Sequence, residues 1–223
     1  MRRYCTTNTK PITVTCSISG KRFNSLHNKR IKEMKQVKDI QIRETNTNDF
    51  DDIMAIEKQA FGYDKEARLV ADLLADPTAE PVVSLLALYQ GEPVGHILFT
   101  RVYFDDPESQ PMMHILAPLA VKPEYQRQGI GGMLIEAGIE KLREKDSALV
   151  FVLGHAEYYP KYGFRPDAAR LGYPAPYPIA EEYRDYWMVQ AIGPKGFETV
   201  KGKIRCCDEL NKPQHWRDEE SDR

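Results

Sequence analysis

Residues 119–144 read LAVKPEYQRQGIGGMLIEAGIEKLRE and contain the most informative local pattern of the chain. It begins with apolar residues typical of a strand, continues through a short basic loop and ends in the pattern of a long helix. Gly129, Gly131 and Gly132 stand at the start of that helix, although glycine inside a helix costs up to about 1 kcal/mol relative to alanine. We infer that this helix start requires the absence of side chains.

A strand, a turn and a helix start in this order can bind an anion. The first helical turn carries backbone amides without partners, and the helix dipole adds partial positive charge. Arg127 stands beside these amides. The spacing is neither GxGxxG nor the P-loop pattern, which disfavours magnesium-nucleotide hydrolysis. A tight turn with close packing is the alternative for the glycines, and for Gly132 we expect packing between helix and sheet.

Apolar periodicity predicts the remaining elements of the chain. Strands are expected over residues 39–45, 81–90, 93–104, 112–121, 148–153 and 186–192, and helices over 47–61, 65–77 and 129–145. Residues 156–164 are expected to form one or two helical turns closed by Gly163. Either Thr47 or Asn48 is expected to cap the first helix.

Two features of this pattern constrain the sheet. Pro118 lies within the strand over 112–121, and because proline cannot donate to a ladder, we expect a bulge or an edge there. The helix between the strands over 112–121 and 148–153 implies a right-handed crossover, which makes those strands parallel. We therefore predict a single α+β (mixed α/β) domain.

Charge divides the chain into three parts. The chain has 223 residues and a net charge of −2, which gives no sign of nucleic-acid binding. Residues 1–38 carry ten Lys/Arg and one acid. They are predicted to be a mobile basic tail or an extended translation start ahead of Met34, and an arm for anionic partners is the alternative. The globular domain is expected over 39–192, and a C-terminal extension over 193–223 ends in a solvated acidic tail, HWRDEESDR.

Cysteine usage favours a reducing compartment. Cys5, Cys16, Cys206 and Cys207 form no CxxC pair, and no secretory signal or long apolar run is present. We predict a cytoplasmic protein without a membrane span or a metal site. A metal site built from Cys206, Cys207 and His215 is the less favoured alternative.

Residues 126–131, QRQGIG, match the Q/R-x-x-G-x-G/A signature of the GNAT N-acetyltransferase superfamily. The resemblance extends over residues 39–192, where the strand, loop, long helix, apolar strand and YYPKYGF (158–164) follow in the family's order. GHILF, PLAV and the proline-rich PYP loop resemble the YhbS-like subgroup. The resemblance implies a GNAT-like fold, in which a central mixed sheet of six to seven strands splays between two parallel strands, with flanking helices.

The resemblance implies acetyl-CoA as co-substrate. By analogy, backbone amides of the glycine loop bind the pyrophosphate, and the strand before it pairs with the pantetheine arm. The implied cofactor-binding residues are Leu119, Ala120, Val121, Gln126, Arg127, Gln128, Gly129, Ile130, Gly131, Gly132 and His155. His155 departs from the Asn or Asp that the family often has after this strand.

The resemblance also implies catalytic roles. Tyr159 occupies the position of the family's tyrosine, which protonates the departing thiolate, and simple aromatic packing is its alternative role. The amide of Val121 is the candidate for stabilising the developing oxyanion. Glu57 is the chosen candidate for the base that deprotonates the amine. The other candidates are His96, His114, His155, Glu157 and a chain of waters.

These observations predict an N-acetyltransferase that acts on a primary amine of a small molecule or peptide. Direct attack in a ternary complex is expected because no cysteine lies near the motifs. A non-catalytic acyl-CoA-binding sensor or regulatory module is the alternative, and a nucleic-acid-binding protein that uses the basic arm is a third. A homodimer is possible. No carboxylate cluster stands out in the helices over 47–75 or the loop over 165–183, so the sequence does not identify the acceptor.

Overall fold

The computed structural model describes residues 39–105, 111–194, 196–198 and 201–216. The predicted basic tail over 1–38 therefore lies outside the described residues. The strands are β1 (Ile40–Glu44), β2 (Val83–Tyr89), β3 (Glu92–Phe104), β4 (Met113–Val121), β5 (Leu149–Leu153), β6 (Trp187–Ala191) and β7 (Ile204–Cys206). The α-helices are α2 (Phe50–Phe61), α3 (Lys65–Ala75) and α4 (Ile130–Glu144), and the 3₁₀ turns include η2 (Thr47–Asp49), η3 (Pro77–Ala79), η5 (Tyr159–Tyr162) and η6 (Glu181–Tyr186).

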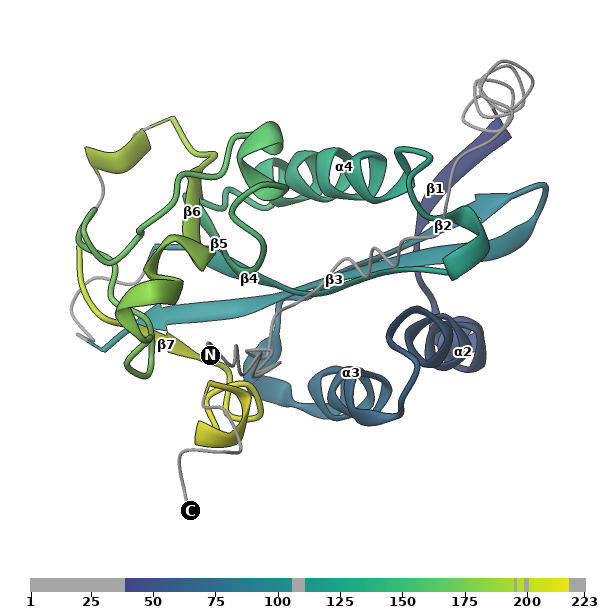
Figure 1. The fold of residues 1–223 in the computed structure, drawn as a ribbon, viewed down its shortest axis with the longest axis horizontal. Coiled ribbons are helices and arrows are strands. Elements are labelled where there is room, and N and C mark those ends of the chain that lie inside the picture. The colour runs from purple at the N-terminus through teal and green to yellow at the C-terminus, as the bar shows by residue number, and fades with distance from the viewer. Residues whose placement is uncertain (1–38, 106–110, 195, 199–200, 217–223) are drawn as a thin grey trace, which may run out of the picture.

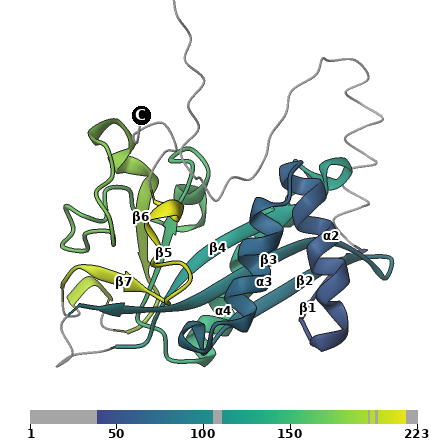
Figure 2. The same cartoon turned by 90° about the horizontal axis from the view of Figure 1, so that it is seen from below.

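One mixed sheet organises the molecule. Its strands follow the order β1-β2-β3-β4-β5-β6, and β7 pairs with the end of β3. The β4–β5 pair is parallel and the other pairs are antiparallel. Helix α4 covers one face of the sheet, and α2 and α3 cover the other (Figures 1 and 2). The predicted α+β class is confirmed, and so is the mixed sheet, which was expected to have six to seven strands and has seven.

The sheet opens between its two parallel strands. The β4–β5 ladder runs from Met113↔Leu149 to Leu116↔Val152, whereas β4 continues to Val121. Just beyond the ladder, a cis bond precedes Pro118 and the β3–β4 register shifts. The bulge predicted from Pro118 is confirmed, but β4 lies between β3 and β5 and is not an edge strand. The last residues of β4 therefore stand beside an opening in the sheet.

Close packing joins α4 to the sheet. The helix buries Leu134, Ile135 and Leu142 against the apolar face of β2 and β3. Gly138 faces the ring of Phe99, where an added Cβ would lie 2.3 Å from a ring carbon. The helix can approach the sheet this closely because Gly138 has no side chain.

The first helix starts differently from the prediction. Asn46, not Thr47 or Asn48, is the N-cap of η2, and α2 follows directly at Phe50. The Asn46 side chain accepts from the Asn48 amide at 2.9 Å, while Asp49 accepts from the Asn46 amide at 2.7 Å. This reciprocal capping box satisfies amides that the helix start leaves without partners. Asp49 lies in the first turn of η2 and closes this box.

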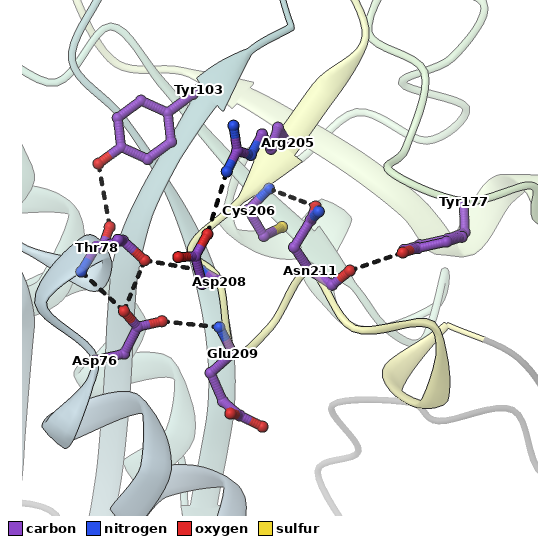
Figure 3. A network of polar contacts seen from close by, with 9 residues as sticks. All are labelled: Asp76, Thr78, Tyr103, Tyr177, Arg205, Cys206, Asp208, Glu209 and Asn211. Carbon is purple, nitrogen blue, oxygen red and sulfur yellow. Dashed lines mark hydrogen bonds and ion pairs between the residues drawn. The ribbon is translucent and has the colours of Figure 1, made fainter.

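The chain beyond residue 192 completes the sheet. Val102 of β3 pairs with Cys206 of β7, although β6 was predicted to be the last strand. Figure 3 shows the contacts that anchor the segment after β7: Asp76 accepts from the Glu209 amide at 2.8 Å, and Thr78 Oγ1 accepts from the Asp208 amide at 2.8 Å. A three-residue strand is too short to show a clear period in the sequence.

The predicted solvated tail needs a correction as well. His215 and Trp216 are buried, and the Trp216 indole donates to the Leu210 carbonyl at 2.7 Å. The rest of that tail, residues 217–223, lies outside the described residues. None of the described helices is long and apolar enough to cross a bilayer.

Candidate active site

The glycine loop ends at the first turn of α4. Gly129 is the N-cap and has a φ of 86°, a left-handed conformation that side chains disfavour. The Met133 amide donates to the Gly129 carbonyl at 3.1 Å. The amides of Ile130, Gly131 and Gly132 precede that bond and have no acceptor within the helix. An added Cβ on Gly129 meets nothing within 4 Å, so the space beside this N-cap is open, as binding of an anionic group at a helix start requires.

The other two glycines make room for tyrosines. An added Cβ on Gly131 would lie 2.6 Å from the Tyr158 hydroxyl, and one on Gly132 would lie 2.4 Å from the Tyr162 hydroxyl. Both tyrosines belong to the segment after β5, so this segment packs under the start of α4. The expected helix–sheet packing at Gly132 is wrong, because its neighbour is the Tyr162 side chain. At Gly131, space for Tyr158 is a second requirement beside access to the amides.

Side-chain amides tie the loop to the open end of β4. Gln126 Nε2 donates to the Val121 carbonyl at 2.9 Å, and Gln128 Nε2 donates to the Glu124 carbonyl at 3.0 Å. Leu119 packs on the α4 side of the sheet, whereas Ala120 packs on the α2 side. The structure thus brings the strand and loop residues of the expected cofactor site together along one side of the opening.

Tyr159 lies at the carboxyl end of β5. Its side chain is fully buried, and its ring packs edge-on against Phe164 with centroids 5.6 Å apart. Gly154 follows β5, and an added Cβ there would lie 2.3 Å from a Tyr159 ring carbon. The bare backbone of Gly154 therefore fixes where the Tyr159 ring lies, beside the point where β4 and β5 diverge.

His155 helps to build this turn. Its carbonyl accepts from the amides of Tyr158 at 3.0 Å and Tyr159 at 3.4 Å, and its ring faces Tyr186 at a centroid distance of 6.1 Å. The turn is the predicted one: η5 ends at Tyr162 and is closed by Gly163, whose φ is 89°. His155 thus lies at the same end of β5 as Tyr159.

Glu57 forms a buried chain of polar groups with His96 and Ser84. Glu57 Oε1 lies 2.7 Å from His96 Nδ1, and His96 Nε2 lies 3.0 Å from Ser84 Oγ. With Glu57 ionised, Nδ1–H donates to Oε1 and Nε2 accepts from the serine hydroxyl. Burial raises the pKa of the Glu57 carboxyl above its usual range, although the contact with His96 opposes that rise.

This chain lies close to the expected donor strand. His96 pairs directly with Ala120, the middle residue of the stretch over 119–121. The side chains of His96 and Glu57 have no exposed surface. They lie between α2 and the sheet, on the sheet face opposite α4. Glu57 and His96 are separate candidates in the sequence, and Ser84 is not a candidate there. Nothing in the spacing of the three residues shows that their side chains are hydrogen-bonded in the fold.

The remaining candidates for the base lie elsewhere. His114 Nδ1 lies 2.9 Å from Ser147 Oγ, and its Nε2 lies 2.9 Å from the Pro81 carbonyl. Burial lowers the pKa of His114 to about 4, as expected for a core histidine with both nitrogens bonded. Glu157 is exposed on the turn before η5. Within the described part of the chain, no group of three or more His, Cys, Asp or Glu could hold a metal ion.

Comparisons with known proteins agree with this arrangement. The profile of the acetyltransferase (GNAT) family matches residues 49–164. The chain is 56% identical over 164 residues to the uncharacterized N-acetyltransferase YjhQ of Escherichia coli K12, a match that covers 74% of this chain and 90% of the relative.

Two solved structures share the fold. The YhbS N-acetyltransferase of Escherichia coli in complex with CoA has a TM-score of 0.68 and 26% identity, covering 78% of this chain and 92% of that one. A GNAT acetyltransferase of Brucella melitensis in complex with acetyl-CoA has a TM-score of 0.60 and 27% identity, covering 77% and 97%. Fold and site therefore define an N-acetyltransferase.

The chain belongs to the acetyltransferase (GNAT) family. The predicted resemblance to the YhbS-like subgroup is confirmed, as are the enzyme class and acetyl-CoA as its co-substrate.

Proposed function

We propose that this enzyme transfers the acetyl group of acetyl-CoA to a primary amine of a small molecule or peptide by direct attack in a ternary complex. The amine nitrogen forms a bond with the thioester carbon, the carbon–sulfur bond breaks, and CoA leaves as a thiolate. The observation that carries the proposal is the opening between β4 and β5 beyond Leu116↔Val152, which adjoins the start of α4.

We propose that the donor lies along that opening. The amides over 128–132 would hold the pyrophosphate, supported by the charge of Arg127 and by the helix dipole. The strand over 119–121 would pair with the pantetheine arm, since β4 continues there beyond its ladder with β5. Gln126 would keep the loop against Val121, and His155 would form the wall at the end of β5.

Tyr159 is proposed as the acid that protonates the thiolate of CoA. A phenol has an ordinary pKa of about 10 and a thiol one of about 8.5, so a phenol can give up its proton to a thiolate only when it is held against the sulfur as charge develops there. Burial against Gly154 and Phe164 holds the ring at one place. The Val121 amide is proposed to stabilise the oxyanion.

Glu57 is proposed as the base that receives the proton of the amine. Its raised pKa makes the carboxylate a stronger base than an exposed one. His96 would orient the Glu57 carboxylate through its hydrogen bond, and Ser84 would in turn hold the His96 ring. The donor would then lie in the opening and the base on its α2 side, with the amine between them.

The buried thiols argue against a covalent acetyl-cysteine. Cys206 and Cys207 belong to β7 and its end, at the far end of β3 from His96. Burial raises the pKa of Cys206 well above its usual value and that of Cys207 to about 11. A thiol with so high a pKa is a poor nucleophile at neutral pH.

The test measures thiol release from acetyl-CoA across a panel of amines, amino acids, aminoglycosides and peptides. At least one amine should be acetylated, and Tyr159→Phe should lower kcat by about 10²-fold or more, the usual contribution of a general acid. Its KM for acetyl-CoA should stay unchanged. Acetyl-CoA binding without acetylation of any amine would favour the sensor instead. An unchanged kcat in Tyr159→Phe would refute the proposed acid.

A further inference from the structure

Two buried carboxylates under α2 and α3 each keep one oxygen without a hydrogen-bond partner. Glu57 Oε2 and Glu66 Oε2 are both inaccessible to solvent and accept from no donor among the described residues. Their other oxygens are engaged, Glu57 Oε1 with His96 and Glu66 Oε1 with the Tyr63 hydroxyl at 3.0 Å. A buried carboxylate oxygen without a donor is costly, so a native structure that keeps two of them calls for an explanation.

The charge of the Glu66 carboxylate acts on Glu57. Glu57 belongs to α2 and Glu66 to the first turn of α3, and the two helices pack together on one face of the sheet (Figure 2). Burial raises the pKa of both groups, and the charge of Glu66 raises the pKa of Glu57 further. The opposing influences are His96 on Glu57 and, on Glu66, its own backbone amide, Tyr63 and the charge of Lys65. The pair is therefore short of both positive charge and donors.

We propose that Glu57 and Glu66 bind the ammonium group of the acetyl acceptor, which makes the acceptor a cationic primary amine without a carboxylate beside its nitrogen. An ammonium group offers three donors and one positive charge, which supplies what the two free oxygens lack. A carboxylate on the same carbon would be repelled by the pair. This inference rests on the proposed acetyl transfer, and it identifies the class of the acceptor.

The position of the pair suits that role. Glu57 contacts His96, which pairs with Ala120 beside the opening. An ammonium group held by Glu57 would thus lie on the sheet face opposite α4 and close to the proposed thioester. After Glu57 accepts a proton from the bound ammonium, the amine that remains is the nucleophile. Tyr63, which is 53% exposed, covers Glu66 from the solvent side.

Calorimetry with matched probes tests the inference independently of turnover. Phenethylamine and phenylalanine share a skeleton and differ by the carboxylate, as do pentylamine and norleucine. The wild-type protein should bind each amine at least about tenfold more tightly than its amino-acid counterpart. Glu66→Gln, which keeps the shape and removes the charge, should weaken amine binding by about 10- to 100-fold, as loss of a hydrogen bond to a charged group does. Acetyl-CoA affinity should not change.

Asp72→Asn is the control, because Asp72 lies on the same helix but is exposed; it should bind both amines as the wild type does. Equal binding of an amine and its amino acid, failure of both amines to bind, or an unchanged affinity in Glu66→Gln would overturn the inference. If thiol release with some other amine persists in that case, the proposed acetyl transfer still stands. Loss of amine binding in Glu66→Gln supports the inference even where no thiol is released.

Discussion

At the scale of single residues, glycines determine where the tyrosines of the site lie. Gly131, Gly132 and Gly154 each leave space that a tyrosine side chain fills. Gly131 of the signature therefore serves two purposes: it leaves the α4 amides accessible, and it lets the segment after β5 pack beneath the helix. A family signature reveals the first purpose, whereas the second appears only when the tyrosines are placed in space.

Gly154→Ala tests this packing. The added methyl would lie 2.3 Å from a ring carbon of Tyr159, whose side chain is fully buried. We expect a loss of about 1–3 kcal/mol in the free energy of unfolding, typical of overpacking, together with a lower kcat. Urea denaturation and thiol release measure the two effects. Wild-type stability and kcat in Gly154→Ala would contradict the placement of Tyr159.

Some residues of the candidate site can be named from the sequence and others cannot. The sequence names the candidate donor-site residues and Tyr159 because they match the family's motifs, and it offers Glu57 as one of several candidates for the base; these roles stay proposals. Ser84 and Glu66 are not predictable, because each meets Glu57 or its partner only after strands and helices distant in sequence have packed. The sequence shows no carboxylate cluster in the helices over 47–75, since Glu57 and Glu66 come from different helices.

At the scale of elements, the start of α2 depends on one carboxylate. Asp49 accepts from both Arg43 terminal nitrogens at 2.7 and 2.6 Å and from the Asn46 amide. These bonds lower the pKa of Asp49 to about 2, mainly through the Arg43 hydrogen bonds and despite burial. Asp49 thereby joins β1 to the helix that carries Glu57.

Asp49→Asn should destabilise the protein at neutral pH by about 1–3 kcal/mol, the worth of hydrogen bonds to a charged group. Because the folded pKa lies below the ordinary value near 3.8, the carboxylate stabilises the fold above that value and loses its effect as the pH falls toward 2. Urea denaturation at several pH values measures the difference, which should shrink between pH 4 and pH 2. A difference that is constant over this range would contradict the assigned role.

The predicted element boundaries agree with the structure where the turn residues are distinctive, and they differ from it where several residues could end an element. The strand and helix bounds agree within a few residues, and the turn at Gly163 is as expected. The observed N-cap is Asn46 and not Thr47 or Asn48. The sequence does not single it out, because several consecutive Asn and Thr side chains could each accept from a helix amide. β7 was missed because its place in the sheet depends on pairing with the end of β3, which its own sequence does not indicate.

At the level of the whole molecule, the segment after β7 is bonded to the end of α3 and to η3. Asp76 accepts from Thr78 at 2.8 and 2.6 Å and from the Glu209 amide at 2.8 Å (Figure 3). Burial alone would raise the pKa of Asp76, but these bonds outweigh it and hold the pKa below its usual value. The sheet continues beyond the domain boundary expected at residue 192, because β7 pairs with β3. We therefore propose that the segment over 201–216 folds with the domain.

Asp76→Ala should therefore lower the free energy of unfolding by about 2–4 kcal/mol, because more than one hydrogen bond to a charged group is lost. Amide hydrogen exchange in residues 204–212 should accelerate more than exchange in β2 or α4. Asp72→Asn, exposed on the neighbouring helix, should change neither quantity. Unchanged exchange in 204–212 would mean that Asp76 does not anchor the segment.

Our proposal places donor and acceptor together at the opening between β4 and β5. A crystal structure of the protein with acetyl-CoA would show whether they meet there. We predict the pyrophosphate on the amides over 128–132, the thioester between residues 119–121 and the end of β5, and its sulfur within hydrogen-bond reach of the Tyr159 hydroxyl. A thioester bound away from this opening, or a sulfur remote from Tyr159, would contradict the account.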